Sequence, residues 1–451
     1  MKPRHCLLLV ALPLLVACGD TSSEAVVADS DTGMADTGAS GGGADVGVGD
    51  DAAVDASGEG DAQEGGATCP GSAPLDTTLT LLPTTYTTQI HAAAAFDGEA
   101  VWVVFNAADT ESGLFKVYAT RIGCDGSPWV PPFRVDSAPD WNKTDPSLVV
   151  NDGRVLIAWQ SDSSCCSDQV NNLDINYRLY DLDGAPLTDE ARLEPTRGGA
   201  PEPGNAWQPV PVAMPEGRFA IVGTLGVQEA NRFQTFAQRL DRDGSPMGDA
   251  IDAALAPDLT QIYPAAAAAA DGTLHMAWTR EEDSGDQFVI TSTLAPGAAS
   301  ASAPQLVRDS SAASPAVAAL PGLTAPVIAM SALTTRGIDV AVKTPAGEET
   351  RVGVGGRNET TPALAVGSEG QLGMAWYRNI RGIQNEVFVG RVDVDSAGAV
   401  SVRGEAMIET DTPAGFYTLG LTHVGEDTFF VVWSEGVSPD YVIKARFVAL
   451  P

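Results

Sequence analysis

The sequence predicts an all-β protein, a seven-bladed β-propeller whose blades are four-stranded antiparallel sheets. The first observation is a repeated unit, in which a strand of small residues leads through an acidic-Gly turn into a second, apolar strand. Tryptophans near the end of this second strand mark the period, because one or two repeats of about 50 to 60 residues separate them, as in repeat proteins. These tryptophans are Trp102, Trp159, Trp278, Trp376 and Trp433.

The second observation is the strand pattern inside each unit. The first two strands of the seven units are expected at 91–96 and 101–105, 146–150 and 155–159, 209–213 and 219–223, 264–270 and 274–278, 315–319 and 326–330, 362–366 and 372–376, and 417–421 and 429–433. Third strands follow, most clearly at 117–121, 175–179 and 235–239, and a fourth at 133–135. Alternation with period 2, bounded by Gly, Pro, Asn and Asp, indicates strands. Four antiparallel strands per repeat indicate a propeller blade.

One segment conflicts with this pattern on propensity alone. The alanine run at 265–270 would favour a helix. It occupies the position of the innermost strand in the other units, and it is too short for a stable isolated helix. Small side chains also suit strands that converge on a central axis, so we expect a strand here.

The third observation concerns how the ring closes. The seventh unit ends after its third strand at 442–447, while an unmatched strand-like segment lies at 77–82. We expect this segment to complete the seventh blade, which would leave no long exposed edge. The propeller domain is therefore expected to span 67–451.

The cysteines fit an oxidising compartment. We expect a disulfide between Cys69 and Cys124, which would staple the incoming strand to the first unit. Cys165 and Cys166 are adjacent, and a vicinal disulfide between them would be strained. The other connectivities of these four cysteines stay open.

The N-terminus carries an export signal. Lys2 and Arg4 precede an apolar stretch at 6–16, which is too short to span a bilayer as a helix. The stretch ends Leu15-Val16-Ala17-Cys18, and this resembles the lipobox of bacterial lipoproteins. The resemblance implies that 1–17 is a signal peptide and that Cys18 is acylated, so the chain would be anchored to a membrane. An ordinary secretory signal is the alternative.

Residues 18–66 are expected to join the lipidated cysteine to the propeller as a disordered tether rich in Asp, Gly and Ala. The stretch 19–66 holds twelve Asp or Glu and no Lys or Arg. It cannot bury enough apolar surface to offset its ordering entropy. By resemblance to other lipoproteins, Gly19 after the cysteine favours the outer membrane, on its periplasmic face or at the cell surface.

The negative charge argues against partners that are bound through clustered basic residues. The formal net charge is −33, and no basic tract interrupts the acidic composition. Nucleic acids and anionic membrane surfaces are bound by clustered Lys and Arg, so neither is expected as a partner.

No catalytic or cofactor motif stands out. His91, His275 and His423 lie far apart in repeated strands and are expected to be packed rather than catalytic. The turns at 181–184 and 241–244 look like fragments of a calcium loop but lack its later Glu, so we expect glycine hairpins there. We therefore assign no catalytic residue, no metal site and no cofactor.

The repeat over about 75–451 resembles secreted propellers grouped with sialidases and with uncharacterised lipoproteins of Gram-negative bacteria. The resemblance is one of architecture. Sialidases would imply Ser-x-Asp-x-Gly-x-Thr-Trp boxes and an arginine triad, and no such box occurs in the sequence. Arg121, Arg239 and Arg446 fall on third strands, where we expect them to face solvent.

A binding rim is expected where the loops entering the innermost strands meet those joining second and third strands. Its residues are aromatic, amide-bearing or charged, which suits a carbohydrate or protein ligand. They are Trp141, Asn142, Asp145, Trp207, Gln208, Tyr263, Asn358, Glu359, Tyr377, Arg378 and Tyr417. The alternative is that the Trp and Tyr side chains fill the channel mouth.

The sequence thus favours a lipid-anchored binding or interaction module of the cell envelope. A glycan-active enzyme of sialidase-like architecture and a scaffold of an envelope assembly complex are the alternatives. Fold alone does not decide among them.

Overall fold

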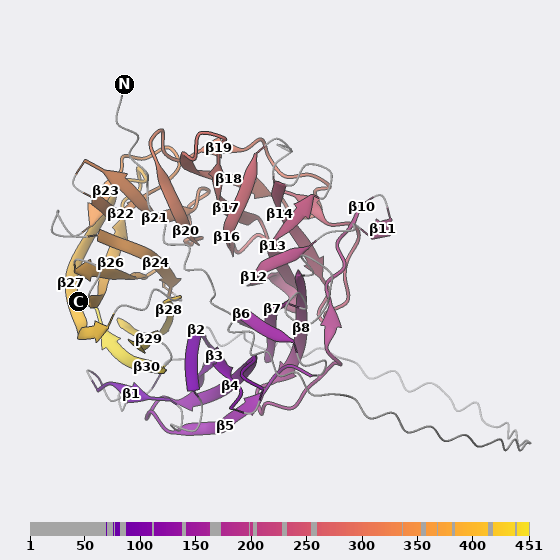
Figure 1. Ribbon diagram of the computed structural model, residues 1–451. Helices are drawn as coiled ribbons and strands as arrows, with labels where there is room; N and C mark the ends of the chain where they lie inside the picture. Colours follow the sequence, from indigo (N-terminus) through magenta and orange to yellow (C-terminus); the bar gives the residue numbers. More distant parts are fainter. Residues whose placement is uncertain are drawn as a thin grey trace, which may run out of the picture. The chain divides into compact units, whose positions relative to one another are not determined.

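The computed structural model confirms the all-β, seven-bladed architecture (Figure 1). The chain divides into two units, Met1–Gln63 and Glu64–Pro451, and all described residues belong to the second. The structure describes 69, 75, 77–81, 87–110, 112–137, 141–162, 173–197, 199–201, 205–227, 232–253, 259–335, 337–352, 358–367, 369–380, 384–413, 418–437 and 440–450. Within these residues no helix has the length and hydropathy that a membrane crossing requires.

Each blade is a four-stranded sheet whose strands follow one another from the central axis outward. The blades are β2 (Thr87–Phe96), β3 (Ala100–Ala108), β4 (Phe115–Gly123) and β5 (Pro128–Arg134); β6 (Asn142–Asn151), β7 (Arg154–Asp162), β8 (Leu173–Asp181) and β9 (Ala191–Arg192); β12 (Ala206–Ala213), β13 (Phe219–Val227), β14 (Arg232–Leu240) and β15 (Ile251–Asp252); β16 (Thr260–Ala268), β17 (Leu274–Glu281), β18 (Gln287–Leu294) and β19 (Gln305–Leu306); β20 (Ala312–Ala318), β21 (Val327–Thr334), β22 (Gly337–Lys343) and β23 (Thr350–Val352); β24 (Asn358–Val366), β25 (Leu372–Ile380), β26 (Gln384–Val394) and β27 (Val400–Pro413); and β28 (Gly420–Gly425), β29 (Thr428–Val437), β30 (Asp440–Ala449) and β1 (Leu79–Thr80). The alanine run lies in β16 up to Ala268, so the expected strand is confirmed there, while Ala269 and Ala270 belong to the turn that follows.

Two features were not expected from sequence. The outermost strands β9, β15 and β19 have only two residues each. A small hairpin, β10 (Thr196–Arg197) with β11 (Ala200–Pro201), is inserted between the second and third blades. Both lie at the outer edge, where strands contact little of the core.

The ring closes as the sequence suggested. β1 pairs antiparallel with β30, with Leu79 opposite Ala445, and so supplies the fourth strand of the seventh blade. Cys69 and Cys124 form a disulfide, with their Cα atoms 5.4 Å apart. The backbone N–H of Cys69 donates to the carbonyl of Val424 in β28 at 2.7 Å. The disulfide therefore ties the seventh blade to the first.

The core lies between neighbouring blades. The five repeat tryptophans all lie on second strands and are fully buried. Inner strands approach closely because their side chains are small. A Cβ atom on Gly420 would lie 2.6 Å from Cγ1 of Val432 and 3.2 Å from the backbone of Ala93 in the first blade. The small-residue strands of the sequence thus reflect the convergence of blades on the axis.

Side-chain amides at the start of inner strands dock successive blades together. In five of the seven junctions, an amide oxygen accepts a hydrogen bond from a backbone N–H in the third strand of the preceding blade. The pairs are Gln89 with Ile443, Asn142 with Phe115, Asn205 with Leu173, Gln261 with Thr235, and Asn358 with Ile338. These bonds satisfy backbone donors of the third strands that would otherwise lack a partner.

The acidic hairpins have the expected structural role. At 181–184, Oδ1 of Asp181 accepts from the backbone N–H of Ala185 at 2.8 Å, and Gly184 adopts φ +82°. The expectation for Arg121 was wrong. Its side chain is buried because Nε donates to Oδ2 of Asp97 at 2.6 Å in the turn between β2 and β3. A buried carboxylate thus draws this arginine inward, away from solvent.

Candidate functional site

A ring of backbone irregularities surrounds the channel near the start of the inner strands. In six blades, the inner strand holds an extra residue relative to its partner, which is a β-bulge, and β2 holds two such bulges. At each bulge one non-glycine residue adopts a positive φ, between 48° and 56°. Thr88 occupies the first bulge of β2, and we call the other six residues, one in each blade, the bulge ring: His91, Asp145, Gln208, Tyr263, Ser314 and Thr361.

The local sequence explains where each bulge forms. In five of the six blades the bulge-ring residue is followed by proline, as in Asp145-Pro146 and Tyr263-Pro264. Proline has no N–H to offer the strand ladder, so the ladder is interrupted at its position. A left-handed residue other than glycine is uncommon and strained, and such strain gathers at functional sites. Because this left-handed residue recurs in six blades around one channel, we infer that the six residues share a functional role.

Contacts between blades hold the ring residues in place. The backbone N–H of Tyr263 donates to Oε1 of Gln208 at 2.9 Å. The backbone N–H of Ser314 donates to the hydroxyl of Thr279 at 3.0 Å in the preceding blade. The side chains of His91 and Asp145, from the first and second blades, contact each other through Nδ1 and Oδ1. The ring is therefore a preorganised surface rather than a set of free loops.

The electrostatics couple ring residues that belong to different blades. Burial raises the pKa of the Asp145 carboxyl, but the charge of His91 and hydrogen bonds from His91 and Thr144 outweigh it and lower the pKa. Burial also raises the pKa of Tyr263, and the negative charges of Asp145 and Glu281 raise it further. Asp145 and Tyr263 lie on β6 and β16, the inner strands of the second and fourth blades, which line the same channel (Figure 1).

The ring includes three of the rim residues expected from sequence. These are Asp145, Gln208 and Tyr263; the Tyr263 side chain is 41% exposed, and its backbone N–H donates to the side chain of Gln208. Sequence reasoning missed His91, Ser314 and Thr361. A polar residue before proline at the start of each inner strand is the signal that would have found Ser314 and Thr361.

The remaining described rim residues lie at the same end of the strands but serve packing. Asn142 and Asn358 form the docking bonds between blades described above. The Trp207 ring packs on Phe233 with centroids 4.3 Å apart. The Trp141 ring lies 5.3 Å from Nζ of the buried Lys143.

Glu359 and Arg378 form a buried ion pair in the sixth blade, and Tyr377 is buried separately, against residues of the seventh blade. Nε of Arg378 donates to Oε1 of Glu359 at 2.8 Å, and the two side chains are 6% and 3% exposed. Burial raises the pKa of Glu359, and the Arg378 partner only partly opposes the rise. The guanidinium of Arg378 also lies 3.7 Å from the ring of Phe388. This group is closed to a ligand.

Other expected positions fall beyond what is described. Cys18, Cys165, Cys166 and Tyr417, together with 1–17 and the tether, lie outside the described residues. Within the described ranges, no group of three or more His, Cys, Asp or Glu side chains is arranged to hold a metal ion.

Comparisons with known proteins bear on the fold. Neither a protein-family model nor a curated protein sequence matches this chain. A solved protein of unknown function from Dyadobacter fermentans is similar, with TM-score 0.53 and 11% identity over 83% of this chain and 98% of that one. A PL25 polysaccharide lyase, an ulvan lyase, matches with TM-score 0.53 and 11% identity over 82% of this chain and 93% of the lyase.

A sialidase from Trypanosoma rangeli, solved with sialic acid, is more distant. It matches with TM-score 0.41 and 11% identity over 73% of this chain and 56% of the sialidase. At such identities a likeness shows the fold alone, and this last one is too weak to carry an argument. The chain is thus a β-propeller of an architecture that also serves glycan-active proteins, and its function must be argued from the site.

Proposed function

We propose that this chain is a lipid-anchored β-propeller of the cell envelope that binds a saccharide at the bulge ring. The observation that carries the proposal is the ring itself. Tyr263 presents an exposed aromatic face, and a carboxylate, an amide and hydroxyl groups surround the same channel mouth. An apolar face with a few oriented polar groups is the arrangement of small-ligand sites. A sugar ring offers the matching C–H face and hydroxyl rim.

The binding experiment uses the full chain with Cys18→Ser, which removes the acylation site. A panel of envelope polysaccharides and oligosaccharides is screened, and hits are measured by calorimetry. Tyr263→Ala is expected to weaken binding at least about tenfold, because the aromatic platform is lost. Trp129→Ala is the matched control, since Trp129 is 49% exposed on β5, far from the ring.

Two results would count against this proposal. In the first, no saccharide binds and a defined envelope protein is captured instead. The ring would then be a protein-binding surface. The other is an equal loss of affinity in the Tyr263 and Trp129 variants.

The anchor is tested separately. Labelled palmitate should be incorporated into the wild-type chain and not into the Cys18→Ser variant, and only the wild type should sediment with membranes. Incorporation into both variants would exclude Cys18 as the acylated residue. Fractionation of the labelled membranes then distinguishes outer from inner membrane.

A glycan-active enzyme is the second candidate, favoured by one observation. Two carboxylates lie near one guanidinium, with Arg378 2.8 Å from Glu359 and 3.9 Å from Glu386, and a pair of carboxylates is what glycoside cleavage uses. The burial of Glu359 argues against contact with substrate. Incubation of a bound saccharide with the protein should therefore release no shorter product, and Glu359→Gln should leave its affinity unchanged.

A further inference from the structure

A pocket lies at the opposite end of the strands from the bulge ring, between the third and fourth blades. Its volume is about 290 Å³. This is near the lower end of the roughly 300–1,000 Å³ of small-molecule sites. The third blade contributes the turn after β12 and the end of β14, and the fourth contributes the turn after β16 and the loop after β18. The site is separate from the one proposed for saccharide.

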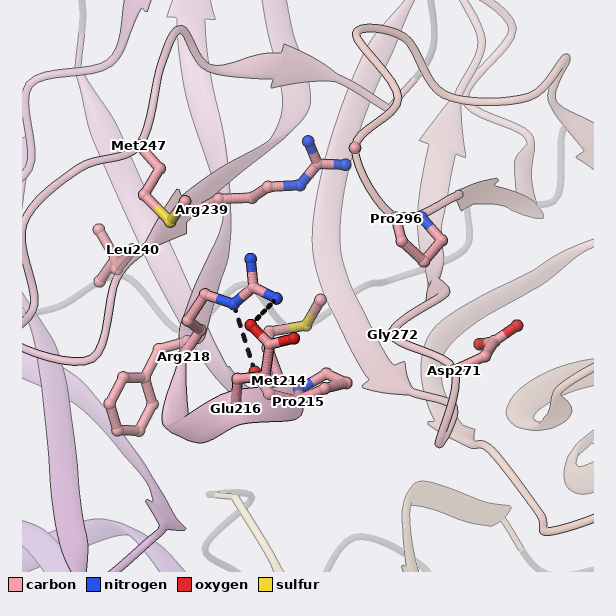
Figure 2. A pocket seen from close by; sticks show the side chains of 12 residues that line it. Met214, Pro215, Glu216, Arg218, Arg239, Leu240, Met247, Asp271, Gly272 and Pro296 are labelled. Atoms are coloured by element: carbon pink, nitrogen blue, oxygen red, sulfur yellow. Dashed lines mark hydrogen bonds and ion pairs between the residues drawn. The ribbon is translucent and has the colours of Figure 1, made fainter. Parts of the chain in front are cut away.

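The lining is apolar with two cations. Met214, Phe219, Leu240, Met247, Pro215 and Pro296 provide hydrocarbon surface around the cavity. The side chains of Arg218 and Arg239 both extend into the same space from the third blade (Figure 2).

The two arginines are held differently. Arg218 is neutralised, because its Nη2 lies 2.7 Å from Oε2 of Glu216. Arg239 donates only to backbone carbonyls, from Nη1 to Ala298 at 3.0 Å and from Nη2 to Ala295 at 2.9 Å. Among the described residues, no carboxylate forms an ion pair with Arg239. Its positive charge is fixed in position and left uncompensated.

The nearby carboxylate of Asp271 does not compensate the charge of Arg239. The Asp271 side chain points away from both guanidinium groups (Figure 2). Its Oδ1 accepts from the backbone N–H of Thr273 at 2.8 Å, which uses it within its own turn. Burial lowers the pKa of Arg239, and the charge of the nearby Arg218 lowers it further.

The backbone is shaped to keep the pocket open. Glu216 and Gly217 are both left-handed, with φ of 63° and 70°, and only the second is a glycine. Gly272 has φ +83°, and a Cβ there would lie 3.2 Å from Pro215 and 3.5 Å from Pro296. Strain in a non-glycine residue persists where the surroundings enforce it. Pro215 and Pro296 can therefore lie close to each other at the base of the cavity.

We propose that this pocket binds a small amphipathic anion, a carboxylate with an apolar body, whose head pairs with Arg239. The planar guanidinium matches a carboxylate through charge-assisted hydrogen bonds. The methionine and proline surfaces would receive the apolar body, and methionine adapts to varied shapes. The small volume excludes a polymer chain, so the ligand differs in class from the saccharide proposed at the ring.

The test uses 3-phenylpropanoate as the probe and its neutral counterpart 3-phenylpropan-1-ol as the matched ligand. Calorimetry is carried out on the full chain with Cys18→Ser. The acid is expected to bind and the alcohol not. Arg239→Gln is expected to weaken binding of the acid about tenfold or more, as loss of a charge-assisted pair would. Arg242→Gln, which removes a neighbouring surface arginine outside the lining, should leave it unchanged.

A second variant guards against misfolding of the first. Met247 is 39% exposed, so Met247→Glu should fold normally, and its new carboxylate should compete for Arg239 and abolish binding. Equal affinity for acid and alcohol, unchanged affinity in Met247→Glu, or no binding by the wild type would each overturn the proposal. Saccharide binding by Met247→Glu should persist, so failure here is distinguishable from failure of the ring.

Discussion

Removal of the disulfide between Cys69 and Cys124 is expected to destabilise the propeller by about 4 kcal/mol. The bond spans a sequence separation of 55 residues. For a loop of that length, the lost entropy of the unfolded chain corresponds to about 4 kcal/mol at 25 °C. The bond also holds the N–H of Cys69 against Val424 in the seventh blade. Its loss therefore weakens the seam of the ring as well.

The assay is equilibrium unfolding in urea of a variant with both Cys69→Ala and Cys124→Ala, which leaves no new free thiol. Tryptophan fluorescence reports on it, since the repeat tryptophans are buried. An unfolding entropy of ~2.1 cal/mol/K per residue over roughly 380 residues predicts a melting temperature lower by about 5 °C. A loss below about 1 kcal/mol would refute the reasoning, because the strand pairing alone would then secure the seam.

Three further predictions concern stability. Arg378→Met should lower the free energy of unfolding by about 3–5 kcal/mol, because it leaves the buried carboxylate of Glu359 unpaired; a drop below about 1 kcal/mol in urea unfolding would contradict a charged Glu359. His275 is buried, and burial lowers its pKa while Asp271 partly opposes this. The unfolded state therefore binds the proton more readily, so stability should fall as the pH drops below about 6.5, and His275→Gln should flatten this pH dependence of the urea midpoint. Gly420→Ala should lower the free energy of unfolding by about 1–3 kcal/mol, because its Cβ would overlap Val432. An unchanged melting temperature would show that the neighbouring blades move apart to accept the methyl group.

The sequence was sufficient for the fold because the core repeats. Each blade needs a small-residue inner strand and a second strand carrying a buried aromatic or aliphatic side chain, and Trp159 and Trp376 mark this plainly. The outermost strands β9 and β15 were not predictable, since strands of two residues contribute little burial and leave no periodic pattern. The hairpin of β10 and β11 was not predicted for the same reason.

The candidate site was only partly predictable. Asp145 and Tyr263 were found because they are polar or aromatic and stand at the start of inner strands. The left-handed backbone was not foreseen, because a residue before proline is ordinarily extended. The bulge depends on pairing with the second strand, and His91, which has no proline after it, becomes part of the ring only through that pairing. Side-chain type alone does not contain this information.

The pocket at Arg239 was missed for a different reason. Its residues come from turns of two blades that are separated along the sequence by tens of residues. Arg239 itself was expected to face solvent. Only the packing of the fourth blade against the third places the carbonyls of Ala295 and Ala298 beside its guanidinium.

The seam has a consequence for the order of folding. β1 is the first strand to be synthesised and β30 the last, so the sheet that joins them cannot form until the whole chain has emerged. Contacts so distant in sequence are slow to find each other. The Cys69–Cys124 bond bridges only 55 residues and is available as soon as the first blade is complete. It would hold β1 beside that blade until β30 has been synthesised. The pairing of β30 with β1 would then take place at a high effective concentration.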